Sequence, residues 1–243
     1  MRNLTHTILL GLCVSLASCQ TTNTDDWFKV GQDIYGQVSG QPLTQQEIAA
    51  GLKQALEVGT NTVVSQLGKR NGFNLDPAIH IPLPDKFANV QRSLQKVGLS
   101  SYLDELELSL NRAAEQAVPK AKQLFWQAIR DMSWDDVMKI YNGPDDAATH
   151  YFQKKMTPVL KREMSPVIKS TLANAGVIKA YDKVMKKYYS IPYVPKVKID
   201  LEDYAMDKTL NGMFYYLAKE EAAIRHDPVK RTTELLKRVF GAK

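Results

Sequence analysis

An apolar stripe that begins after Ser101 constrains the fold of this chain more than any other feature. Leucine and alanine recur in steps of three and four residues at positions 103, 106, 110, 113, 117, 121, 124 and 128. This spacing places one apolar face along about seven turns of helix, and such a face must be buried against other helices. We therefore predict a long central helix, kinked near Glu115 because Pro119 removes one backbone donor.

Shorter stretches carry the signals that start other helices. Thr44 and Glu47 have the spacing of a capping box, and Ser133 and Asp200 are further N-cap candidates. Prolines 158 and 166, each after a hydroxyl residue, predict broken helices instead of one rod. The prolines among alternating apolar residues at 73–84 predict an extended segment that allows one short strand pair. The fold class we expect is all-α, a single bundle of about seven to nine helices, some of them kinked by proline.

The first residues of the chain do not belong to this bundle. Arg2 is followed by an apolar run at 8–14 that is too short to span a bilayer. The ending Leu16-Ala17-Ser18-Cys19 resembles the bacterial lipobox, whose cysteine is acylated after the signal is removed. The resemblance implies a lipoprotein signal peptide at 1–18, a lipidated N-terminus and flexible tether at 19–41, and the helical domain at 42–241. The alternative is a plain secretory signal with an incidental cysteine.

The lipobox has further consequences for location and chemistry. Gln20, after the cysteine, implies export to the outer membrane, so we expect a lipid anchor there and a domain that faces the periplasm. Cys13 would leave with the signal and Cys19 would carry lipid. The mature domain would then have no thiol for a disulfide, a metal site or a nucleophile.

Positive charge is concentrated between residues 153 and 198. This stretch holds eleven Lys and Arg against Glu163 and Asp182, a local net charge of +9. A periplasmic protein is not expected to meet nucleic acid, so the partners considered are anionic head groups or an envelope protein. The residues that could meet a membrane surface are Lys186, Lys187, Tyr188, Tyr189, Tyr193, Lys196 and Lys198. The alternative is a solvated basic loop whose tyrosines pack on the domain.

The sequence has no catalytic or cofactor motif that we recognise, including nucleophile-elbow, zinc-helix, phosphate-loop and dinucleotide patterns. His80, His150 and His226 are far apart, and none has another histidine four residues away that would suggest a zinc helix. We therefore expect a protein that is not an enzyme and that holds neither a metal nor a cofactor.

Asp145, Asp146, Thr149 and His150 form a polar group after the turn at Asn142-Gly143. One interpretation is a functional cluster. The favoured interpretation is a helix start, with proline 144 as the first helical residue and the two carboxylates near free backbone amides.

The last long helix places charge on an apolar stripe formed by positions 206, 210, 213, 217 and 224. Glu220 takes the missing position, with Glu221 beside it and Arg225 one turn further. An unpaired buried charge is costly, so these groups need partners. On the central helix Arg112 and Glu115, next to Asn111, flank the apolar stripe.

We therefore hypothesise a polar seam that joins Arg112, Glu115, Glu220 and Arg225 between two core helices. Three interpretations remain open: a buried ion network that fixes helix register, the floor of a pocket for a small molecule or lipid, or an acid–base pair.

Several stretches together resemble the family of proteobacterial envelope lipoproteins known as domain of unknown function 4197. The resemblance implies a helical envelope protein and supplies no activity. The stretches are Leu43-Thr44, Gly51-Leu52-Lys53, Ile81-Pro82-Leu83-Pro84, Asn111-Arg112-Ala113-Ala114-Glu115, Asp145-Asp146-Ala147-Ala148-Thr149 with Tyr151-Phe152, Glu221 with Ile224-Arg225 and Pro228, and Arg231-Thr232-Thr233 with Val239-Phe240-Gly241.

Overall fold

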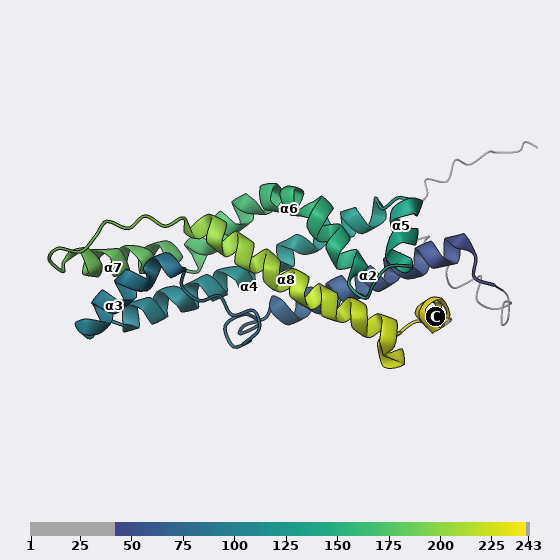
Figure 1. The fold of residues 1–243 in the computed structure, drawn as a ribbon, viewed down its shortest axis with the longest axis horizontal. Coiled ribbons are helices and arrows are strands. Elements are labelled where there is room, and N and C mark those ends of the chain that lie inside the picture. The colour runs from purple at the N-terminus through teal and green to yellow at the C-terminus, as the bar shows by residue number, and fades with distance from the viewer. Residues whose placement is uncertain (1–41, 242–243) are drawn as a thin grey trace, which may run out of the picture. The chain divides into compact units, whose positions relative to one another are not determined.

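The computed structural model describes residues 42–241, and the regular elements in this range are helices (Figure 1). They are α2 (Gln45–Leu67), η2 (Asp85–Phe87), α3 (Ala88–Lys96), α4 (Ser101–Arg130), α5 (Trp134–Tyr141), α6 (Ala147–Asn174), α7 (Val177–Tyr189), α8 (Leu201–His226), η3 (Pro228–Lys230) and α9 (Glu234–Gly241). The expectation of an all-α bundle is confirmed for these residues. The predicted signal peptide, Cys19 and tether lie outside them.

Local capping explains where several helices begin. Thr44 and Glu47 form the predicted capping box at α2, and Ser133 forms another with Asp136 at α5. At α8 the carboxylate of Asp200 accepts hydrogen bonds from the backbone N–H groups of residues 202 and 203. Each contact satisfies amides that the first turn of a helix leaves without partners.

The predicted central helix is α4, which packs against α2, α6, α7 and α8. Its stripe from Leu103 to Ala121 is buried, whereas Leu124 and Ala128 are partly buried. α4 continues through Pro119 to residue 130. The hydrophobic core draws on every α-helix from α2 to α9, so residues 42–241 build a core of their own. Among these residues, no helix is both long and apolar enough to cross a bilayer.

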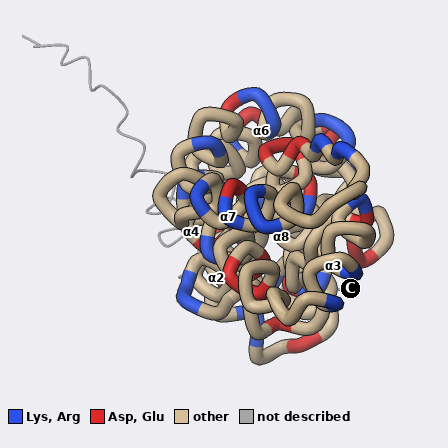
Figure 2. The backbone as a smooth tube through the Cα atoms, turned by 90° about the vertical axis from the view of Figure 1, so that its left-hand side faces the viewer, with Lys and Arg blue, Asp and Glu red and all other residues tan. Residues whose placement is uncertain are grey.

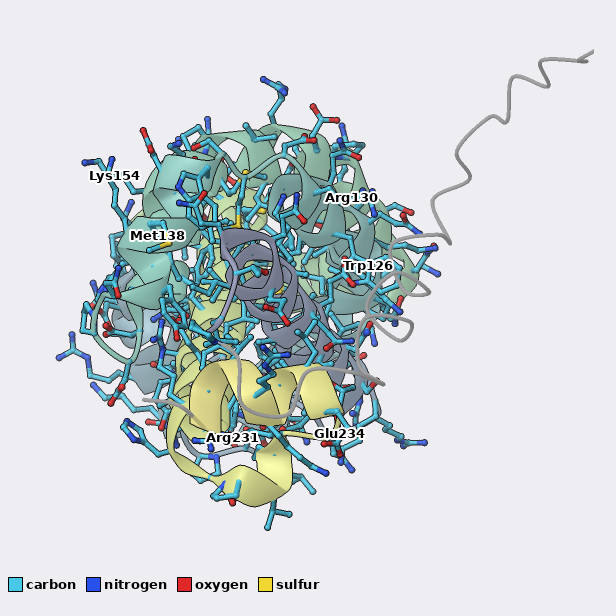
Figure 3. The ribbon with its side chains drawn as sticks, turned by 90° about the vertical axis from the view of Figure 1, so that its right-hand side faces the viewer. Trp126, Arg130, Met138, Lys154, Arg231 and Glu234 are labelled. Atoms are coloured by element: carbon cyan, nitrogen blue, oxygen red, sulfur yellow. The ribbon has the colours of Figure 1, made fainter. Side chains whose placement is uncertain are left out.

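α9 packs across the first half of α2 at one end of the domain. Figure 3 looks onto this end, with Arg231 labelled before α9 and Glu234 labelled at its first residue. Gly51 permits the close approach, because a Cβ atom there would lie 2.6 Å from Cγ2 of Val239. Arg238 and Glu47 join the same two helices through an ion pair of 2.8 Å.

The prediction of broken helices at the two prolines is wrong. α6 is one helix of 28 residues that contains both Pro158 and Pro166, and it is bowed in Figure 1. Both prolines are exposed. The carbonyl groups that lose their N–H partners can therefore bond to water, and the helix bends without ending.

The predicted extended segment before α3 forms turns and irregular chain, and no strand pair occurs between residues 42 and 241. Its backbone groups bond to side chains of α4. The N–H of Ile81 donates to Oδ1 of Asn111 (2.9 Å), and Nδ2 of Asn111 donates to the carbonyl of Ile81 (2.8 Å). The amide side chain of Asn111 thus satisfies both backbone groups of Ile81, so no neighbouring strand is needed to bond them.

Candidate functional site

Glu221 is the buried carboxylate that caps α6. Its Oε1 accepts from the N–H of Ala148 (2.9 Å), and its Oε2 accepts from the N–H of Thr149 (3.0 Å) and from the hydroxyl of the same residue (3.1 Å). These amides belong to the first turn of α6, where the helix dipole favours a negative charge. A side chain of α8 therefore completes the start of a helix 72 and 73 residues earlier in the chain.

Arg225 lies one turn after Glu221 and binds the opposite end of another helix. Its guanidinium donates to the carbonyls of Ile140 (2.8 Å) and Tyr141 (3.3 Å) at the end of α5, and to Glu221 (3.0 Å). Both charged side chains are at least nine-tenths buried. The pair, which we call the α8 clamp, places a negative group on free N–H groups and a positive group on free carbonyls.

The two aspartates after Gly143 do not cap α6, although the helix start was predicted at this turn. Asp146 is at the N-cap position, but its side chain makes no capping hydrogen bond and lies 3.3 Å from His150. The carboxylate of Asp145 lies 2.7 Å from Nε2 of His226. α6 begins at Ala147, after the residue predicted to be first. The capping charge comes from α8 because α8 packs against α6 and brings Glu221 to its first turn.

Glu220 is the less buried of the two neighbouring glutamates on α8. Its carboxylate accepts a hydrogen bond from Nζ of Lys230 at 3.1 Å. We expected a charge on this stripe to be paired with a cation, and Lys230 is that cation. The buried charge is Glu221, one residue later. The stripe alone could not show this, because a shift of one residue turns the side chain by about 100° around the helix.

The second buried carboxylate, Glu115 on α4, holds the turn that follows α2. Its Oε1 accepts from the N–H groups of Phe73 (3.2 Å) and Asn74 (3.1 Å), and its Oε2 accepts from Arg112 (2.6 Å). Arg112 also donates to Oδ1 of Asn71 (2.7 Å), whose backbone is left-handed with φ of 69°.

Asn111 and Glu107 continue this arrangement along α4. Besides the pair of bonds between Asn111 and Ile81, Glu107 accepts from the N–H of Leu83 (3.2 Å) and lies 2.8 Å from Nε2 of His80. We call Glu107, Asn111, Arg112 and Glu115 the α4 clamp. It holds residues 71–83 on the helix.

The hypothesis of one polar seam is therefore wrong in its connections. Arg112 and Glu115 bond to the 71–74 turn, whereas Arg225 bonds to Glu221 and the end of α5. Among the described residues no polar contact joins the two pairs. Each pair satisfies backbone groups of its own neighbourhood.

A small cavity lies beside the α8 clamp, between α2, α6, α8 and α9. Its volume is about 20 Å³, which is room for about one water molecule. The walls are mainly apolar, with Thr60, Thr149, Glu221 and Arg225 as polar members, and Nε of Arg225 has no hydrogen-bond partner in the described chain. A small organic ligand needs roughly 300 Å³ or more. The residues Arg112 and Glu115 do not line this cavity.

The α7–α8 connection separates the predicted membrane-surface residues into two groups. Tyr188 is fully buried, and its hydroxyl donates to the carbonyl of Pro195 (3.0 Å); burial raises the pKa of this phenol. The hydroxyl of Tyr189 donates to the carbonyl of Val197 (3.2 Å) and accepts from its N–H (3.1 Å). Lys187 lies over the ring of Tyr102. Tyr188 is buried in the domain, whereas Tyr189 is half-exposed, and the hydroxyls of both hold the connection back onto α7.

The remaining four residues face solvent at the end of the domain opposite the start of α2 (Figure 1). Tyr193 is fully exposed, and Lys186, Lys196 and Lys198 are exposed beside it. Within residues 42–241, none of these three lysines forms an ion pair. We call these four residues the basic tip. Figure 2 looks onto this end and shows Lys and Arg positions beside the α7 and α8 labels.

Comparison with known families agrees with the resemblance in the sequence. A family model described as "Protein of unknown function (DUF4197)" matches residues 42–241. The chain belongs to this family. No curated protein and no solved structure matches it.

In this DUF4197 chain, the stretches that carry the resemblance make the contacts of the two clamps and of the α2–α9 junction. Asn111, Arg112 and Glu115 hold the segment with Ile81, and Glu221 and Arg225 hold the α5–α6 turn. Sequence reasoning missed Glu107, although its spacing of four residues before Asn111 was visible. Lys53 was named only within the resemblance, and its role was missed: its ammonium group donates to the carbonyls of residues 130 and 132 at the end of α4.

Proposed function

We propose that this DUF4197 protein is a lipoprotein anchored through Cys19 in the outer membrane, that its domain faces the periplasm, and that it binds a partner without catalysing a reaction. The location is supported by the lipobox-like sequence before Cys19 and by the residue that follows it. Two or three acyl chains would hold such a protein stably at a bilayer.

One observation favours binding over catalysis: backbone N–H groups donate hydrogen bonds to both buried carboxylates of the clamps. Glu115 and Glu221 each accept from two backbone N–H groups and from an arginine. These bonds occupy the carboxylate oxygens with groups of the domain itself, so the oxygens are not presented to a substrate. The geometry of these clusters is that of structural supports.

The location is tested by the intact mass of the protein purified from membranes. We expect a chain that begins at Cys19 and carries acyl chains. The Cys19→Ser variant should keep its leader and lack the lipid. A mature wild-type chain without lipid would overturn the anchor.

Binding is tested by native mass spectrometry of the protein extracted from its own envelope in mild detergent. A retained protein or phospholipid supports the proposal. The second candidate is a protein that binds a small molecule or lipid in a helical pocket; the cavity beside the α8 clamp disfavours it, because its volume of about 20 Å³ holds about one water molecule. A retained small organic molecule that Arg225→Met releases would favour that candidate instead.

A further inference from the structure

The basic tip is assembled by bonds that fold one chain segment onto another. The hydroxyls of Tyr188 and Tyr189 bind the backbone at residues 195 and 197, at distances of 3.0 to 3.2 Å. These bonds hold Lys196 and its neighbour Lys198 against the last turn of α7, where Lys186 lies. Three exposed lysines separated in sequence therefore lie at the same end of the domain.

Tyr193 lies on this surface in a backbone conformation that is unfavourable and that no contact within the domain offsets. Its backbone φ is 64°, in the left-handed region that disfavours a residue with a β-carbon. Its side chain is fully exposed, so the ring gains no burial in the domain. An aromatic side chain that costs backbone energy and buries nothing indicates a contact outside the domain.

We propose that the basic tip docks on an anionic phospholipid bilayer, with the three lysines at the head groups and the Tyr193 ring at the interface. The proposal rests on the proposed function only for placing the protein at a membrane. Lysines near an anionic leaflet gain electrostatic energy individually. Tyrosine suits the head-group level because its ring is apolar and its hydroxyl is polar.

The anchor and the basic tip can meet the same bilayer. α2 begins at the opposite end of the domain, and α4 alone spans about 45 Å with its 30 residues (Figure 1). About twenty residues between Cys19 and the domain can reach roughly 70 Å when extended. The linking chain is therefore long enough for the domain to lie with its far end on the membrane that holds its lipid.

The test uses a chain from Gln20 to Lys243, which keeps the whole domain and its core but carries no lipid. Binding is measured by co-sedimentation with vesicles of phosphatidylcholine alone and of phosphatidylcholine mixed with phosphatidylglycerol. We expect binding to the mixed vesicles only, weakened by salt.

Two matched variants separate the basic tip from general charge. Lys186→Gln/Lys196→Gln/Lys198→Gln should reduce the partition coefficient roughly a hundredfold. The control Lys120→Gln/Lys154→Gln/Lys169→Gln removes the same charge from exposed lysines elsewhere and should change it less than about threefold. Equal losses would mean that net charge drives binding and would overturn the proposal.

Tyr193→Gly supplies a readout that a structural role would not give. Glycine accepts the left-handed backbone, so thermal stability should stay the same or rise, while vesicle binding falls several-fold. Lower stability together with unchanged binding would overturn the assignment of the tyrosine.

The outcomes also separate this proposal from the proposed function. If the Gln20–Lys243 chain does not bind anionic vesicles but sediments with an insoluble anionic glycan, the basic tip has a different partner and the bilayer proposal is wrong. If it binds neither, the basic tip is solvated surface. In both cases an acylated Cys19 in the native protein would leave the anchored binding protein intact.

Discussion

Glu221 and Arg225 lie one turn apart on α8 and bond to the ends of two different helices, the carboxylate to the first amides of α6 and the guanidinium to the last carbonyls of α5. The sharp turn between α5 and α6 thereby gains both partners from a third helix. Since each charge also bonds the other at 3.0 Å, loss of either leaves an uncompensated buried group.

The α8 clamp predicts unequal effects at two neighbouring glutamates. Glu221→Gln should lower the free energy of unfolding by about 3 kcal/mol, because Arg225 stays buried without its counter-charge. Glu220→Gln, which removes a more exposed pair with Lys230, should cost about 1 kcal/mol or less. Urea unfolding of both variants measures this, and equal losses would contradict the assignment of Glu221 as the buried charge.

Two glycines on α2 should respond in opposite directions to alanine. At Gly51 a Cβ atom would lie 2.6 Å from Val239, so Gly51→Ala should displace α9 and cost about 1–3 kcal/mol. At Gly59 the nearest atom would be 3.7 Å away, so Gly59→Ala should stabilise the helix by about 0.5–1 kcal/mol.

Hydrogen exchange of α9 supplies the local readout for this pair. Protection of α9 should fall in Gly51→Ala and recover when Val239→Ala is added, because the smaller side chain makes room for the new methyl group. Unchanged protection in Gly51→Ala would show that α9 does not depend on this close approach.

The α4 clamp predicts a local effect at residues 71–83. Asn111→Ala leaves the N–H and carbonyl of Ile81 buried without partners and should cost about 2–4 kcal/mol. Limited proteolysis should cut this segment faster in the variant. Gln127→Ala, on the exposed side of the same helix, is the control and should stay within about 0.5 kcal/mol.

Asp136 at the start of α5 predicts a dependence of stability on pH. The hydroxyl of Ser133 is the main cause that lowers the pKa of Asp136 from 3.8 to about 2; burial opposes it, and Lys155 and Tyr151 add to it. The folded state thus favours the ionised carboxylate. Its stabilising contribution is complete above the unfolded-state pKa of 3.8 and is lost as the pH falls through about 2.

Asp136→Asn should therefore unfold more easily than wild type near neutral pH, and the difference should shrink as the pH falls below 3.8. Thermal unfolding across this range measures it. The control Asp135→Asn keeps the capping box at Ser133, so an identical pH profile for both variants would exclude Asp136 as its source.

Elements whose signals are local were predictable from the sequence. The capping box of Thr44 and Glu47 and the caps at Ser133 and Asp200 join residues at most three apart, so their spacing is visible in the sequence itself. The apolar stripe of α4 was visible for the same reason, because helical periodicity is a property of one segment.

The prolines of α6 show where such local reasoning ends. A proline inside a helix costs one hydrogen bond, but whether the helix stops there depends on the surroundings of the freed carbonyl. In α6 that side faces solvent, which follows from packing against α4 and α8 and is not encoded near residues 158 and 166.

The sequence by itself determined an all-α chain, most of its helix starts, and the need for partners at charges that lie on or beside apolar stripes. Only the tertiary structure decided that Glu221, not Glu220, is the buried carboxylate on α8, and that backbone groups of α5 and α6 are the partners of the α8 clamp. The physical reason is that every residue except proline offers the same backbone N–H and carbonyl. Any residue can therefore be the partner of a side chain that bonds to the backbone, and no particular residue type in the sequence marks that partner.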